Sequence, residues 1–161
     1  MAIERKGIFS FNNQDVTVVG EDIQVGQQAP EFDVFAMDWS AFKGLQDTTG
    51  KVRIIGAVPS LNTAVCDRET RRFNQEAAAL GQNIAILIVS MDLPWAQKEW
   101  CGAAGIDKVV TLSDHKDASF GIQYGVLVKE QRILRRAVFV VDRSDKLVYV
   151  AYMAALGEEP N

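Results

Sequence analysis

Apolar residues along this chain of 161 residues fall into alternating stretches and short continuous runs, and both patterns predict strands. Near the N-terminus, apolar and polar residues alternate through IFSFNNQDVTVVG around the turn-forming pair Asn12-Asn13, which predicts a β-hairpin. The runs KVRIIGAV at 51–58 and NIAILIVS at 83–90 are rich in β-branched residues, as in strands buried on both faces. A shorter strand is expected over 32–36.

A helix is predicted between the two long apolar runs. Its stripe follows helical spacing and consists of Val65, Glu69, Phe73, Ala77 and Leu80, and Gly81 supplies a stop. The strand, helix and strand in this order predict a parallel pair of strands in a sheet covered by helices.

The second half of the chain continues the same alternation of helices and strands. A helix is expected to begin at Leu93-Pro94, with Asp92 as its N-cap, and to end at Gly102 and Gly105. The segments after it predict a strand at 109–112, a short helix at 117–124 and two strands at 136–142 and 146–152 joined by a tight turn. This order predicts an α/β fold, a thioredoxin-like sandwich with a mixed central sheet flanked by helices and an N-terminal β-hairpin. Since no linker or repeat interrupts the chain, we expect one domain over 1–161.

Composition narrows the possible partners. Apolar residues make up 48% and charged residues 24% of the chain, as in ordinary globular proteins. The net charge of -4 argues against a nucleic-acid partner, and no apolar run reaches membrane-spanning length. The start, MAIERKGIFSF, lacks the apolar segment of a secretory signal, so we expect a cytoplasmic location. There, the two cysteines are expected to serve chemistry rather than to form a purely structural disulfide.

Cys66 lies in PSLNTAVC, where the first turn of the predicted helix begins. Unpaired backbone N–H groups and the helix dipole at this position favour the reactive thiolate over the thiol. Taken alone, a buried cysteine acting as a small apolar residue explains Cys66 equally well.

Cys101 lies near the C-terminal end of its predicted helix, where the dipole disfavours negative charge, so its thiol is expected to be the less acidic one. One activated and one ordinary thiol suit an attacking and a resolving role. The distance between them in sequence excludes a C-x-x-C motif, and two isolated cysteines with one histidine do not match the ligand spacing of a zinc site. We therefore expect no metal.

Thr63 and Pro59 complete this candidate site. The hydroxyl of Thr63 lies one helical turn from Cys66, so it can cap the helix and can also hold a second oxygen atom beside the sulfur. Pro59 fixes the chain as it leaves the strand and removes a backbone donor; it can equally be a plain strand terminator.

The pattern P-x-x-x-T-x-x-C, formed by Pro59, Thr63 and Cys66, resembles the active-site signature of the peroxiredoxins. With the segments RRFNQ, SMDLPWAQKEWCG and RRAVFVVD in the same order, the chain resembles the bacterial thiol peroxidases, which are atypical two-cysteine peroxiredoxins. The resemblance runs from Gly7 to Pro160.

This resemblance implies a peroxidase that reduces hydrogen peroxide and organic hydroperoxides without a cofactor. Cys66 would be the peroxidatic cysteine and Cys101 the resolving one, in an intramolecular disulfide that thioredoxin reduces; the family commonly forms homodimers. The family's active-site arginine falls on Arg136. Strand alternation then directs the neighbouring Arg135 to the opposite face, where we expect it to be solvated.

One departure and two alternatives accompany this interpretation. The family usually continues past the region of GEEPN into a C-terminal helix, so we expect that this helix is missing and that apolar sheet surface is exposed. A Cys-His hydrolase would pair Cys66 with His115, the only histidine. A catalytically silent interaction module would merely bury both cysteines.

Overall fold

The computed structural model describes residues 2–62, 64–80, 83–106 and 108–153, and for 64–67 and 77–80 it describes the backbone alone. The predicted hairpin is present: β1 (Glu4–Phe11) pairs with β2 (Gln14–Val19) in antiparallel register. Asn12 and Asn13 form the turn with φ of 50° and 64°, a left-handed conformation that asparagine tolerates. The hairpin continues into a small sheet with β8 (Leu127–Val128) and β9 (Ile133–Leu134), two strands that the sequence pattern did not predict.

The central sheet is mixed, as predicted. In the described part of the chain its order is β11-β10-β5-β6-β7-β3-β4. The middle strands β5 (Val52–Ala57), β6 (Ile84–Ser90) and β7 (Val110–Ser113) are parallel, whereas β10 (Ala137–Val141), β11 (Leu147–Tyr152) and β3 (Asp33–Phe35) join them in antiparallel pairs. The short edge strand β4 (Ala41–Lys43) was not predicted.

Successive side chains of the central strands point to opposite faces of the sheet, and a hydrophobic core lies on each face. In β6, Leu87 and Val89 belong to the larger core, and Ile86 and Ile88 belong to the core that also contains Cys101. A continuous apolar run in sequence therefore becomes two opposite faces, as expected for a strand covered on both sides.

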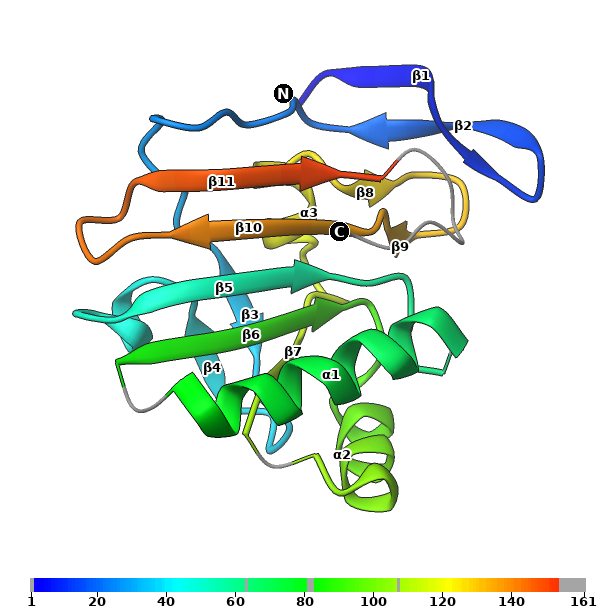
Figure 1. Ribbon diagram of the computed structural model, residues 1–161. Coiled ribbons are helices and arrows are strands. Elements are labelled where there is room, and N and C mark those ends of the chain that lie inside the picture. The colour runs from blue at the N-terminus through cyan, green and yellow to red at the C-terminus, as the bar shows by residue number, and fades with distance from the viewer. Residues whose placement is uncertain (1, 63, 81–82, 107, 154–161) are drawn as a thin grey trace.

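Helices α1 (Ala64–Leu80) and α2 (Pro94–Ala104) lie on one face of the sheet, and the short α3 (Ser119–Gln123) lies behind it (Figure 1). Gly105 ends α2 in a left-handed conformation with φ of 71°, as predicted, whereas Gly102, also predicted to end the helix, lies inside it. The prediction that Asp92 caps α2 is wrong, because the N-cap is Leu93 and makes no side-chain cap bond. Among the described residues, no helix combines the length and the apolar character needed to span a membrane.

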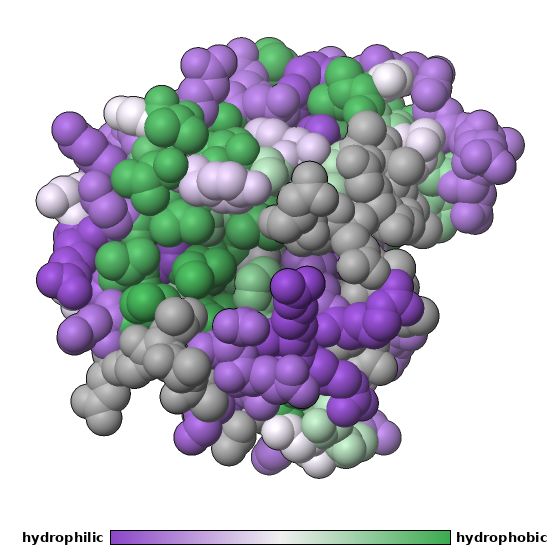
Figure 2. Space-filling model, in the orientation of Figure 1, coloured by the Kyte–Doolittle hydropathy of each residue, from purple (hydrophilic) through white to green (hydrophobic). Residues whose placement is uncertain are grey.

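Apolar side chains gather on the front of the outer strands (Figure 2). Val140 of β10 and Tyr149 of β11 are cross-strand neighbours, and Tyr149 is 43% exposed. The expected loss of a C-terminal helix concerns the chain beyond β11, where residues 154–161 lie outside the described part, so it stays a prediction.

Candidate active site

The loop between β5 and α1 places Cys66 at the start of a helix, as the sequence predicted. Val58 donates its backbone N–H to Val89 at 3.0 Å, Pro59 follows as a buried residue, and α1 begins at Ala64. Cys66 is the third residue of α1, within the first turn, where backbone N–H groups lack helical partners. Its side chain and the whole of Thr63 lie outside the described residues.

Arg136 lies directly before β10 and is 1% exposed. Its Nη1 donates a hydrogen bond to Glu69 Oε2 at 2.7 Å, and both side chains are buried. Glu69 belongs to α1, one turn after Cys66. The ion pair therefore fixes a guanidinium group against the first two turns of the helix that carries Cys66.

Glu69 is a further candidate site residue, one that the sequence did not indicate as such. It occupied a position in an otherwise apolar helical stripe, and a charged residue on such a stripe signals a buried partner. The position of that partner, 67 residues later in the chain, could not be found from periodicity alone.

The expectation that Arg135 is solvated is wrong. Arg135 points away from Arg136, as strand alternation predicts, but it is 6% exposed. Its Nε donates to the Met153 carbonyl at 2.8 Å, and its guanidinium carbon lies 4.6 Å from the ring centroid of Tyr152. The side opposite α1 is covered as well, so a residue turned away from the helix still enters the protein interior.

Cys101 lies in the last turn of α2 and is 5% exposed. Its Sγ lies 3.7 Å from Thr111 Oγ1, and Cys101 packs in the same hydrophobic core as Ile86 and Ile88. Burial raises the pKa of the Cys101 thiol, while the contact with Thr111 lowers it by less. The thiol is therefore less acidic than a free cysteine because it is buried; its acidity relative to Cys66 stays a prediction, since the Cys66 side chain lies outside the described residues.

Asp92 connects the loop before α1 with the segment before α2. Its carboxylate accepts hydrogen bonds from Ser60 Oγ at 2.8 Å, from the Leu61 backbone N–H at 2.9 Å and from Ser90 Oγ at 2.8 Å. The Asp92 carboxylate, which was predicted to cap α2, thus accepts the backbone N–H of Leu61 in the loop before α1. The carboxylate reaches across 31 residues, and no local pattern could indicate this.

His115 is half-buried on the segment after β7. Its Nδ1 lies 2.9 Å from Ser113 Oγ, and its ring lies 5.4 Å from that of Trp39 and 6.0 Å from that of Phe35. Within the described residues, no group of three or more His, Cys, Asp and Glu side chains is close enough to hold a metal ion.

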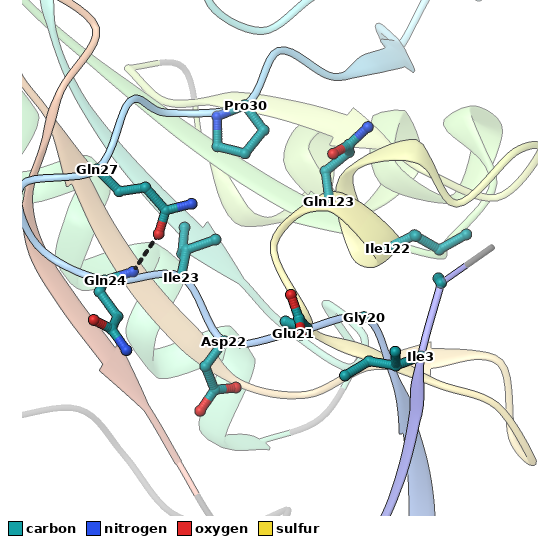
Figure 3. A pocket seen from close by; sticks show the side chains of 11 residues that line it. Ile3, Gly20, Glu21, Asp22, Ile23, Gln24, Gln27, Pro30, Ile122 and Gln123 are labelled. Carbon is teal, nitrogen blue, oxygen red and sulfur yellow. Dashed lines mark hydrogen bonds between the residues drawn. The ribbon is translucent and has the colours of Figure 1, made fainter.

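A separate hollow of about 450 Å³ lies among the end of β2, the segment that follows it and α3. Figure 3 shows Gln27 turned toward Gln24, whose backbone N–H it accepts at 3.0 Å. Glu21 and Asp22 line the same hollow. Of the described candidate residues, Pro59, Cys101 and Arg136 do not line this hollow.

Comparison with known proteins decides the family. The family model described as Redoxin matches residues 24–161. Thiol peroxidases from Oceanobacillus iheyensis and Bacillus subtilis are 53% and 51% identical to this chain over 94% of its length and over 92% and 90% of theirs. The chain belongs to the thiol peroxidases of the redoxin family.

Solved structures agree with this membership. A peroxiredoxin-like protein from Aquifex aeolicus matches with a TM-score of 0.87 and 36% identity, over 97% of this chain and 92% of that one. A thiol peroxidase from Chromobacterium violaceum shares the fold, with a TM-score of 0.81 at 18% identity, over 93% of this chain and 87% of that one. The predicted thioredoxin-like fold is confirmed. As a thiol peroxidase, the protein is a peroxiredoxin-type oxidoreductase that reduces peroxide, which sets aside the hydrolase and the silent interaction module.

Proposed function

We propose that this thiol peroxidase reduces hydrogen peroxide and organic hydroperoxides at Cys66, forms an intramolecular disulfide with Cys101 and is recycled by thioredoxin. The observation that carries the proposal is the buried guanidinium of Arg136, held at 2.7 Å by Glu69 one turn beyond Cys66. A fixed positive group beside a helix N-terminus suits a reaction in which negative charge develops on oxygen.

In the first step, the Cys66 thiolate attacks one peroxide oxygen, so that an S–O bond forms and the O–O bond breaks. The sulfur is oxidised to a sulfenic acid, and the departing oxygen takes up a proton and leaves as water or an alcohol. The Arg136 guanidinium and backbone N–H groups of the first helical turn would stabilise the charge on that oxygen. Thr63 would orient the peroxide through its hydroxyl, and Pro59 would shape the wall of the pocket.

In the second step, the Cys101 thiol condenses with the sulfenic acid. The S–S bond forms, and the hydroxyl group of the sulfenic acid leaves with the thiol proton as water. Because burial raises the pKa of Cys101, this thiol stays protonated while α2 is in place. A dithiol of thioredoxin would then reduce the disulfide by exchange and restore both thiols.

The resemblance to the bacterial thiol peroxidases also suggests the electron donor, the oligomeric state and the compartment. The electron donor would be thioredoxin, the chain would form a homodimer, and the compartment would be the cytoplasm. Analytical ultracentrifugation of the reduced protein tests the dimer, and a sedimentation coefficient of a monomer at micromolar concentration would contradict it.

The test is the oxidation of NADPH in the presence of thioredoxin, its reductase and a hydroperoxide. Cys66→Ser should abolish peroxide reduction, because the nucleophile is gone. Cys101→Ser should consume one equivalent of peroxide at the wild-type rate and then stop, because the sulfenic acid has no resolving thiol. An equal loss of the first turnover in both variants would contradict the assignment.

A further inference from the structure

A continuous set of hydrogen bonds runs from the loop before α1 to the buried side of α2. At one end, the Asp92 carboxylate holds the Ser60 hydroxyl and the Leu61 backbone N–H. These residues immediately follow Pro59 and lead into the helix of Cys66. The bonds of Asp92 therefore fix the backbone that presents the attacking cysteine.

At the other end, Ser90 connects Asp92 with Gln97 of α2 through hydrogen bonds. Ser90 is fully buried at the end of β6; its hydroxyl donates to Asp92 and accepts Gln97 Nε2 at 3.0 Å. Gln97 is also fully buried, and it donates to the Leu112 carbonyl at 2.8 Å. Gln97 lies one helical turn before Cys101, so a movement of α2 that exposes the Cys101 thiol must disturb these bonds.

Asp92 is also held from its backbone side. The Ser113 hydroxyl donates to the Asp92 carbonyl at 2.6 Å, and the Asp92 backbone N–H donates to Ser90 Oγ at 3.3 Å. Asp92 is thus bonded to Ser90 at the end of β6 and to Ser113 at the end of β7. Its carboxylate therefore accepts three hydrogen bonds, two from the loop before α1 and one from the end of β6.

We propose that Asp92 is a positioning residue that couples the two cysteine segments of the reaction. It holds the 59–62 loop in the arrangement that supports attack on peroxide, and it releases this loop when α2 loosens to deliver Cys101. The inference rests on the proposed roles of Cys66 and Cys101. Asp92 is not assigned any contact with peroxide.

The coupling has a thermodynamic consequence. Bonds that exist in the reduced arrangement and break in the disulfide form stabilise only the dithiol. Their removal shifts the equilibrium toward the disulfide, whereas a residue that stabilises both forms equally leaves the equilibrium unchanged.

The experiment is a redox titration of the full chain against reduced and oxidised dithiothreitol, with the Cys66–Cys101 disulfide measured by peptide mass spectrometry. In this exchange, the protein dithiol gives two electrons and two protons to oxidised dithiothreitol, which becomes the dithiol as the protein disulfide forms. Asp92→Ala should shift the equilibrium about tenfold toward the disulfide, which corresponds to a reduction potential lower by about 30 mV. Its single-turnover rate of peroxide attack should also fall severalfold, because the loop is no longer fixed.

Asp142→Ala is the matched control. Asp142 is also half-buried, and its carboxylate accepts two backbone N–H groups, from Ser144 at 2.8 Å and Lys146 at 2.9 Å, in the turn between β10 and β11. It should change neither the redox equilibrium nor the attack rate. Asp92→Asn should stay close to the wild type, because an amide oxygen can still accept the Leu61 N–H while the amide nitrogen donates to Ser60.

The outcomes separate the inference from the proposed function. If the wild type forms no Cys66–Cys101 disulfide, the proposed function fails. If it does form one and Asp92→Ala titrates like Asp142→Ala, the coupling role of Asp92 is overturned. Should Asp92→Ala not fold, Ser60→Ala removes one donor of the same network and must shift the equilibrium in the same direction by a smaller factor; an unchanged equilibrium would again overturn the inference.

Discussion

Arg136 and Arg135 are adjacent residues whose guanidinium groups lie on opposite sides of the sheet. Arg136 pairs with Glu69 beneath the helix of Cys66, and Arg135 packs on Tyr152 and donates to the Met153 carbonyl. Burial is similar for both, so exposure alone does not separate a chemical role from a structural one. Their partners do, because only Glu69 belongs to the helix that carries Cys66, the proposed attacking cysteine.

Replacement of the two arginines should therefore affect different quantities. Arg136→Ala should slow the attack on peroxide by a factor on the order of 10²–10³, because a fixed donor is lost from the transition state. Arg135→Ala should leave the attack rate within about twofold and lower the free energy of unfolding by about 1–3 kcal/mol, because the Met153 carbonyl loses its donor. Stopped-flow kinetics and urea unfolding measure the two effects. A slower attack in the Arg135 variant with no change in the Arg136 variant would reverse the assignment.

The buried carboxyl group of Asp114 should make the stability of the folded protein depend on pH. It is 2% exposed and accepts the backbone N–H groups of Phe120 at 3.1 Å and Gly121 at 2.7 Å. Burial, which outweighs these bonds, raises its pKa from 3.8 to about 6. Between these values the folded state binds a proton that the unfolded state does not, so stability is highest below the lower value and is lost as pH rises toward 6.

We expect the free energy of unfolding to fall between pH 4 and pH 7 by on the order of 2–3 kcal/mol more in the wild type than in Asp114→Asn. The variant cannot ionise at this position, although it loses one acceptor for the α3 backbone at every pH. Urea titrations across this range measure the difference in slope. Parallel pH profiles of the two proteins would show that Asp114 titrates normally.

At the scale of elements, α2 carries the buried thiol of Cys101 close to its C-terminal end, where two glycines lower the stability of the helix. Gly102 is exposed inside the helix, and a Cβ placed there would meet no atom within 4 Å. Gly105 ends the helix with φ of 71°, a conformation that disfavours any residue with a Cβ. These two glycines offer opposite ways to change the stability of the segment that carries Cys101.

Gly102→Ala should stabilise α2 by about 1 kcal/mol and slow disulfide formation by up to about fivefold, with the attack on peroxide unchanged. Gly105→Ala should act in the opposite direction, because it strains the helix end. The rates of the two steps can be separated by tryptophan fluorescence after a single peroxide pulse. If neither substitution altered the rate of disulfide formation, loosening of α2 would not be part of that step.

The elements themselves were largely predictable from the sequence. The runs at 51–58 and 83–90 and the helical stripe between them carry enough apolar periodicity to predict β5, β6 and α1. Strands β4, β8 and β9 escaped prediction because two or three residues are too short to show a period. The partners of Glu69 and Asp92 were unpredictable for a different reason, since their bonds join residues that lie far apart in the chain and that only the fold brings together.

At the scale of the whole molecule, the two cysteines lie in different helices on one face of the central sheet (Figure 1). Cysteines can form a disulfide only if their Cα atoms come within about 7 Å. We expect the reduced protein to keep them farther apart, so that the first turn of α1, the segment 92–105, or both must open locally. Amide hydrogen exchange should show lower protection of these segments in the disulfide form, and identical exchange in both redox states would contradict this expectation.

In the proposed reaction, Cys66 reduces one peroxide molecule, and Cys101 of the same chain then condenses with the resulting sulfenic acid to form a disulfide. The most direct measurement adds one equivalent of hydrogen peroxide to the reduced protein and identifies the product by intact and peptide mass spectrometry without a reductant. We predict a loss of two hydrogen atoms per chain, with the Cys66 and Cys101 peptides joined and no bond between chains. A sulfenic acid that accumulates on Cys101, or a disulfide that links Cys66 of one chain to another chain, would contradict the account.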